Sequence, residues 1–131
     1  MSKLYFRYAA MNAGKSTALL QVAHNYEERG HRVRIFTARL DDRHGTGRVT
    51  SRLGLQREAR TFGADTVFEL GGLDDPVACL LIDEAQFLTP EQGRQLHRLA
   101  HTRRVPVICY GLRSDFRGEA FPGAAALLTL A

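Results

Sequence analysis

Apolar residues along the chain change repeatedly between the short runs typical of strands and the one-face spacing typical of helices. Residues 4–10 are aromatic-rich and predict a strand. Apolar residues then recur at i, i+3, i+4 and i+7, which predicts a helix over 15–29, and Gly30 follows as a natural stop. Polar and apolar residues alternate over 31–37, which predicts a second strand. The order is therefore strand, helix, strand.

The second half of the chain repeats this order. Residues 77–82 are continuously apolar, as in a strand buried on both faces of a parallel sheet. Residues 89–92, Thr-Pro-Glu-Gln, carry a capping-box pattern with proline at the first helical position, and predict a helix over 90–102. Another apolar strand is expected over 105–110. The alternation predicts an α/β fold, a mostly parallel sheet flanked by helices with right-handed crossovers.

The remaining segments have weaker patterns. Residues 38–63 lack a sustained period and predict a long loop, or an excursion with a short hairpin. Residues 64–76 predict only a turn. A polar loop is expected over 111–122 and an apolar helical stub over 124–131. Because no repeat or linker separates these segments, one domain over 1–131 is expected.

Composition and charge narrow the possible partners. The chain has 131 residues, 44% of them hydrophobic, which is enough for a core. Its 18 basic and 14 acidic residues give a net charge of +4, which permits an anionic partner. All but two of the basic residues are arginines, and the lysines are Lys3 and Lys15. Residues 39–60 are rich in arginine but lack interleaved aromatic residues, so nucleic acid is disfavoured against a loop over a nucleotide or at a subunit contact.

The two cysteines and the hydropathy indicate where the protein works. Cys79 and Cys109 each lie within an apolar run, which predicts reduced core thiols and favours the cytoplasm. The N-terminus does not resemble a signal peptide, and no apolar run approaches the ~18 residues that span a bilayer. Secretion and membrane insertion are therefore not expected. His97 and His101 have a metal-compatible spacing, but without a third ligand they predict a solvated helix face.

Two short motifs point to nucleotide chemistry. Gly14-Lys15-Ser16 lies between the first strand and the first helix, where a phosphate-binding loop belongs, although Ala9 replaces the first glycine of the full pattern. In this interpretation Lys15 bridges the β- and γ-phosphates, and Ser16 and Asp83 hold Mg²⁺. Asp83 and Glu84 end the buried strand over 77–82, which we expect to neighbour the first strand. Glu84 could take a proton from an acceptor hydroxyl or from water, so kinase and ATPase both stay open.

Four segments together resemble one family. They are residues 4–17, 51–56, 82–88 and 110–116, and they are similar to the cytosolic and bacterial (type II) thymidine kinases. The resemblance covers essentially the whole chain. It implies a RecA-like P-loop NTPase fold and the transfer of a phosphoryl group from ATP to the 5′-hydroxyl of thymidine, in pyrimidine salvage and DNA precursor synthesis.

The resemblance also assigns roles to particular residues. Glu84 would be the base that takes the proton of the 5′-hydroxyl. The loop that holds the ATP phosphates would comprise Ala9, Ala10, Met11, Asn12, Ala13, Gly14, Lys15 and Ser16. The nucleotide and magnesium site would be lined by Asp83, Glu84, Ala85 and Gln86, with Asp41 and Arg43 near the phosphates. The apolar wall around the thymine ring would comprise Met11, Phe87, Leu112 and Phe116.

One departure from the family concerns the C-terminus. Family members continue past the helix that begins near Ala124 into another strand, a zinc-binding region with paired cysteines and a lid, or lasso, loop over the base. A C-terminally truncated chain without the structural zinc, and with poor nucleoside affinity, is therefore expected. Two alternatives stay open, a nucleotide-binding module without turnover and a DNA-associated P-loop ATPase. The family also implies a homotetramer.

Overall fold

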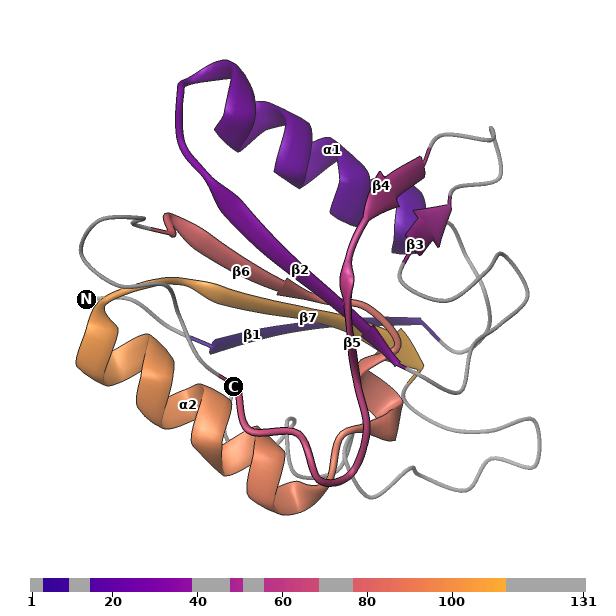
Figure 1. The fold of residues 1–131 in the computed structure, drawn as a ribbon, viewed down its shortest axis with the longest axis vertical. Helices are drawn as coiled ribbons and strands as arrows, with labels where there is room; N and C mark the ends of the chain where they lie inside the picture. Colours follow the sequence, from indigo (N-terminus) through magenta and orange to yellow (C-terminus); the bar gives the residue numbers. More distant parts are fainter. Residues whose placement is uncertain (1–3, 10–14, 39–47, 51–55, 69–76, 113–131) are drawn as a thin grey trace.

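The computed structural model describes residues 4–9, 15–38, 48–50, 56–68 and 77–112. Its centre is a five-stranded, wholly parallel sheet with the strand order β1-β7-β6-β2-β5. The strands are β1 (Leu4–Ala9), β2 (Val33–Ala38), β5 (Arg60–Phe62), β6 (Cys79–Ile82) and β7 (Val107–Leu112). Helices α1 (Lys15–Glu28) and α2 (Pro90–Arg103) cover opposite faces of this sheet (Figure 1). The predicted α/β fold with a parallel sheet between helices is confirmed.

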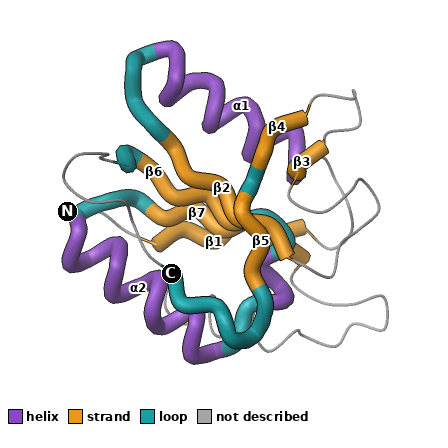
Figure 2. Tube along the Cα trace, viewed as in Figure 1, coloured by secondary structure: helices purple, strands orange, loops and turns teal. Residues whose placement is uncertain are grey.

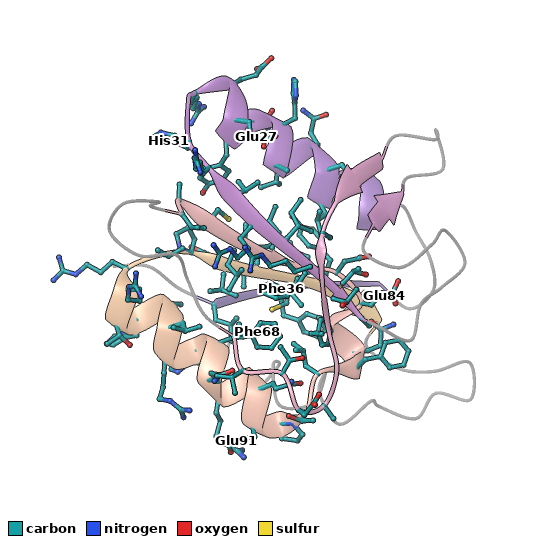
Figure 3. The ribbon with its side chains drawn as sticks, viewed as in Figure 1. Glu27, His31, Phe36, Phe68, Glu84 and Glu91 are labelled. Atoms are coloured by element: carbon teal, nitrogen blue, oxygen red, sulfur yellow. The ribbon has the colours of Figure 1, made fainter. Side chains whose placement is uncertain are left out.

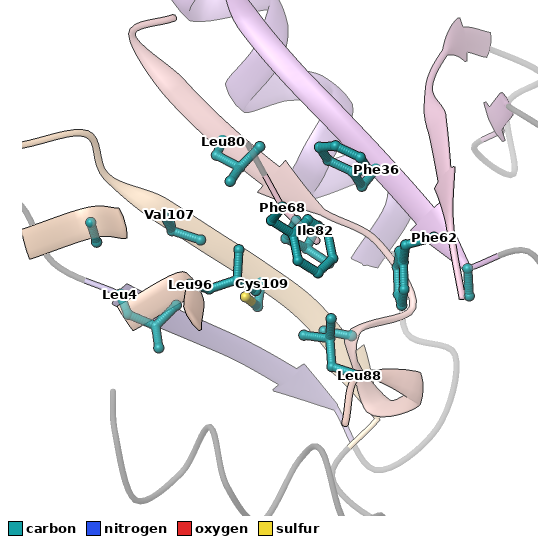
Figure 4. Close-up of a cluster of buried hydrophobic side chains, with 13 residues drawn as sticks. Leu4, Phe36, Phe62, Phe68, Leu80, Ile82, Leu88, Leu96, Val107 and Cys109 are labelled. Atoms are coloured by element: carbon teal, nitrogen blue, oxygen red, sulfur yellow. The ribbon is translucent and has the colours of Figure 1, made fainter. Parts of the chain in front are cut away.

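Side chains along each strand alternate between the two helical layers. On β6, Cys79 and Leu81 pack beneath α1 with Leu19 and Ala23, whereas the alternate residues of the strand face α2. The larger α2-side cluster includes Leu80 and Ile82 of β6 and three aromatic rings (Figure 4). Phe68 lies 4.9 Å from Phe36 and 5.6 Å from Phe62, as measured between ring centroids. Strand β6 is buried on both faces, which confirms the prediction from the apolar run over 77–82.

The region expected to be a loop contains three short strands. Strands β3 (Arg48–Thr50) and β4 (Gln56–Glu58) form an antiparallel hairpin, which lies beside the first half of α1 (Figure 2). Of the two predictions for this region, a long loop or an excursion with a short hairpin, the second is confirmed. The assignment of β5 to loop is wrong, because Arg60–Phe62 pairs with Phe36–Ala38 at the edge of the main sheet. Only Phe62 of its three residues is buried. The strand therefore arises from its pairing with β2 and carries no local period.

Local signals place the helix ends correctly. Gly30 has a φ of 80°, its N–H donates to the carbonyl of Glu27, and the N–H of His31 donates to that of Tyr26. These two bonds form a Schellman motif, which ends α1. At the start of α2, the Thr89 hydroxyl accepts from the Gln92 N–H while the Gln92 side chain accepts from the Thr89 N–H. The predicted capping box is confirmed.

Both cysteines lie in the core, as predicted, but on opposite sides of the sheet. Cys79 belongs to the cluster beneath α1 and Cys109 to the cluster beneath α2. Burial raises the pKa of Cys79 to about 11 and raises that of Cys109 further. His97 and His101 are exposed on α2, as expected. Within the described ranges, no helix has the length and apolar character needed to cross a membrane.

Candidate active site

The carboxyl ends of the central strands bring buried polar side chains together. Parallel strands end at the same edge of a sheet, and α1 begins at this edge because it follows β1 directly. Figure 3 shows Glu84 where the strand arrows end, and Glu27 and His31 at the far end of the molecule. Thr37, Asp83, Glu84, Gln86 and Gln92 are the buried polar side chains among the described residues, and the first four lie at or just beyond these strand ends. Buried carboxylates need hydrogen bonds or a cation, so this edge is the candidate site.

Asp83 forms hydrogen bonds to β2 through both its main chain and its side chain. Its N–H donates to the carbonyl of Phe36 over 2.7 Å, which extends the β2–β6 pairing by one residue. The Thr37 hydroxyl donates to Oδ2 of Asp83 over 3.3 Å. Val33 and Ile35 of β2 and Cys79 and Leu81 of β6 pack on the α1 side of the sheet. Thr37 and Asp83 each lie two residues further along, so the alternation of side chains places both on the same side. Asp83 is thus held on the face where the first turn of α1 lies.

Glu84 turns the chain out of the sheet. Its backbone has φ 56° and ψ 43°, a left-handed conformation that costs a residue other than glycine roughly 1–2 kcal/mol. The turn leads into the short 3-10 helix η1 (Ala85–Phe87), whose Phe87 N–H donates to the Glu84 carbonyl. The Glu84 carboxylate accepts a 2.6 Å hydrogen bond from Nε2 of Gln86 and is only 5% exposed. A strained residue with a buried carboxylate is typical of a functional position.

Gly111 of β7 lies directly against η1. A Cβ at this position would stand 2.7 Å from the side-chain Oε1 of Gln86. It would also stand 2.9 Å from the main-chain nitrogen of Gln86 and 3.1 Å from that of Ala85. Real side chains do not approach this closely, so only glycine lets η1 sit on β7 in this way. Oε1 of Gln86 therefore lies beside Gly111, while its Nε2 donates to Glu84.

The phosphate-loop strand and the acid-bearing strand are not adjacent. The expectation that they neighbour each other is wrong, because β7 lies between β1 and β6. Since neighbouring strands are ~4.8 Å apart, the two strand ends are separated by about 10 Å. The start of α1 and Asp83 therefore lie at the same edge of the sheet, with β7 between the strands that lead to them.

The residues present fit a magnesium ion. The described residues contain no group of three or more His, Cys, Asp or Glu side chains placed to hold a metal. Magnesium does not need such a cage, because it binds through one or two carboxylates together with substrate phosphates and water. Asp83 supplies a buried carboxylate of this kind.

Comparisons with known proteins point to one family. A sequence model described as thymidine kinase matches residues 2–131. Over the whole chain, the sequence is 66% identical to a thymidine kinase of Albidiferax ferrireducens and covers 66% of that protein. It is 60% identical to a thymidine kinase of Chromobacterium violaceum and 55% identical to one of Idiomarina loihiensis, of which it covers 71% and 70%.

The chain belongs to the thymidine kinase family. The family resemblance drawn from the sequence is thereby confirmed, and with it the class of enzyme, a phosphotransferase that uses ATP. The chain spans about two thirds of the length of these relatives. All of its own residues are included in the matches.

Part of the site expected for a thymidine kinase falls within the described structure. Ala9 pairs with Leu112 at the ends of β1 and β7, and Lys15 and Ser16 form the start of α1. These four residues converge on the edge that carries Asp83. Phe87 is 41% exposed at the end of η1, so its ring is accessible beside the acids. The predicted residues outside the described part of the chain are Ala10, Met11, Asn12, Ala13, Gly14, Asp41, Arg43 and Phe116.

Two residues of the site were missed in the sequence. Thr37 was overlooked because its role depends on a strand pairing across 46 positions. Gly111 followed a predicted strand, but its close approach to Gln86 depends on the path of η1. A small or hydroxyl residue at the carboxyl end of a predicted parallel strand is the feature that could have indicated both.

Proposed function

We propose that this chain transfers the γ-phosphoryl group of ATP to the 5′-hydroxyl of thymidine, giving thymidine monophosphate and ADP. The observation that carries the proposal is the pair of buried carboxylates, Asp83 and Glu84, at the carboxyl end of β6 in a member of the thymidine kinase family. The two groups have different partners, Thr37 for Asp83 and Gln86 for Glu84.

Glu84 is the proposed general base. Its carboxylate accepts the proton of the 5′-hydroxyl while the hydroxyl oxygen forms a bond to the γ-phosphorus. The bond from that phosphorus to the bridging oxygen breaks, and ADP leaves with the electron pair. A carboxylate has about four lone-pair positions, so it can accept the bond from Gln86 and the substrate proton together.

The phosphates are assigned to the first turn of α1 and the loop before it. Lys15 would bind the β- and γ-phosphates, and the main-chain N–H groups from Ala9 to Ser16 would surround them. The positive end of the α1 dipole favours an anion at the same place. Asp41 and Arg43 are assigned to the same phosphates.

Ser16 and Asp83 are the proposed magnesium ligands. Bound there, Mg²⁺ would neutralise charge on the transferring group. Thr37 would keep the Asp83 carboxylate turned toward α1. The apolar wall around the thymine ring is assigned to Met11, Phe87, Leu112 and Phe116, of which Phe87 is exposed beside the acids.

Three broader features belong to the same proposal. Residues 1–131 form the nucleotide-binding core of the kinase, and the structural zinc of the family belongs outside it. The buried thiols Cys79 and Cys109 suit a reducing compartment, so the reaction is placed in the cytoplasm. A homotetramer is expected from the family.

Product analysis tests the proposal. The chain is incubated with γ-labelled ATP, Mg²⁺ and thymidine, and label is expected in thymidine monophosphate. 5′-Deoxythymidine is the matched control, because it keeps the base but lacks the acceptor hydroxyl, and it should receive no label. Phosphate release that DNA stimulates, without a labelled nucleotide product, would instead show an ATPase. Binding of ATP with neither product would show a module without turnover.

A further inference from the structure

The Gln86 side chain lies between the buried Glu84 carboxylate and Gly111, where a Cβ would overlap Oε1 of Gln86. We propose that Gln86 is a positioning residue, which fixes the Glu84 carboxylate in the orientation that receives the substrate proton, and that Gly111 makes this arrangement possible. The inference rests on the proposed role of Glu84 as the base.

The backbone of Glu84 does not by itself fix its carboxylate. A glutamate side chain has three rotatable bonds, and η1 begins immediately after this residue. A base must stay within hydrogen-bond reach of the hydroxyl, and a displacement of about 1 Å can lower a rate roughly 100-fold. The 2.6 Å bond from Nε2 of Gln86 supplies one such restraint. Both side chains are about 95% buried, at 5% and 4% exposure, so water competes little for the bond.

Gly111 leaves open the space that the Gln86 amide occupies. Oε1 of Gln86 lies 2.7 Å from the position that a Cβ of residue 111 would occupy, and the main-chain nitrogen of Gln86 lies 2.9 Å from it. The oxygen end of the amide therefore packs on the bare Cα of Gly111, while the nitrogen end meets Glu84. The amide group thus lies between Gly111 of β7 and Glu84, two residues after the end of β6.

An amide suits this task because it does not titrate. It donates to Glu84 when the carboxylate is charged and remains beside it after the proton has been received. Gln86 itself exchanges no proton with the substrate. Its effect should therefore appear in the rate of the chemical step and not in the binding of ATP.

Steady-state kinetics of the full chain with ATP, Mg²⁺ and thymidine test the inference. Gln86→Met keeps the length of the side chain and removes the donor, so kcat should fall about 10- to 100-fold while the KM for ATP changes less than about twofold. Gln86→Glu keeps the shape but places a second acceptor beside Glu84, and should lower kcat further. The matched control is Gln95→Met, which removes a glutamine whose Oε1 accepts from the Phe68 N–H, away from the acids. It should lower the thermal midpoint and leave kcat unchanged.

A double variant separates positioning from general damage. If Gln86 acts through Glu84, adding Gln86→Met to Glu84→Gln should produce no further fall in the residual rate. If Gln86→Met lowers kcat by the same factor in the wild type and in Glu84→Gln, the inference is overturned. An unchanged kcat in the single variant Gln86→Met would also overturn it. If Glu84→Gln itself retains full activity, the proposed base is wrong, whatever Gln86 does.

A crystal structure of the Gln86→Met variant gives a result that does not depend on turnover. The Glu84 carboxylate should leave its position or occupy several. If it stays in place without the amide, the positioning role is refuted even in an active enzyme. If the wild-type chain makes no thymidine monophosphate, the proposed function fails, and this structure still decides whether Gln86 fixes the carboxylate.

Discussion

The bond between Thr37 and Asp83 leads to a measurable prediction for Thr37→Val. The change keeps the shape of the side chain and removes the hydroxyl that donates to the Asp83 carboxylate over 3.3 Å. A hydrogen bond to a charged group contributes about 1.5–3 kcal/mol, and the length of this bond favours the lower end of that range. For a domain of this size, a loss of about 1.5 kcal/mol lowers the midpoint of thermal unfolding by roughly 5 °C.

Circular dichroism melts of the wild-type and variant chains, with and without Mg²⁺ and ATP, measure this change. We also expect the variant to need more Mg²⁺ for half-maximal activity, because Asp83 loses the group that orients it. Thr61→Val is the matched control, since Thr61 lies beside Thr37 in the β2–β5 pair and should tolerate valine with little change. Equal midpoints and equal Mg²⁺ requirements in wild type and Thr37→Val would refute the reasoning.

Three further predictions concern stability. Burial raises the pKa of Cys79 to about 11 and that of Tyr110 to about 12, so above pH 9 the folded chain binds more protons than the unfolded chain. The free energy of unfolding, measured by urea titration, should fall between pH 9 and 11, and it should fall less in Cys79→Ala. A free energy of unfolding that does not change over this pH range would contradict the prediction. Thr89→Ala removes the capping box and should cost about 1 kcal/mol by urea unfolding, whereas Thr89→Ser should not. Gly111→Ala places a methyl 2.7 Å from Oε1 of Gln86 and should cost about 1–3 kcal/mol in the same assay, and an unchanged urea midpoint would contradict the close approach.

The parts of the fold that the sequence predicted are those with local causes. The continuous apolar run before Asp83 predicted β6, and the structure buries all four strand residues completely. The capping box predicted the start of α2 because its bonds join residues three positions apart. The pair Asp83 and Glu84 was found for the same reason, since it ends a strand whose pattern is unambiguous.

The parts that escaped prediction depend on contacts between distant segments. Strand β5 has one buried residue, Phe62, and becomes a strand because β2 lies beside it. The position of β7 between the two halves of the site follows from the order of strands, which the hydropathy pattern does not encode. The roles of Thr37 and Gly111 depend on register and on the path of η1, which no short stretch of sequence specifies.

The role of Glu84 is tested most directly by comparing turnover and ATP binding in Glu84→Gln. The change keeps the shape of the side chain and removes its capacity to accept a proton, so thymidine-dependent turnover should fall at least about 100-fold. The dissociation constant for ATP, measured by calorimetry, should stay within about twofold, because the phosphates are assigned to the first turn of α1 and the loop before it, and Mg²⁺ to Ser16 and Asp83. Glu91→Gln, at an exposed glutamate of α2, should change neither quantity. Turnover in Glu84→Gln that equals the wild-type rate would contradict the assignment of Glu84 as the base.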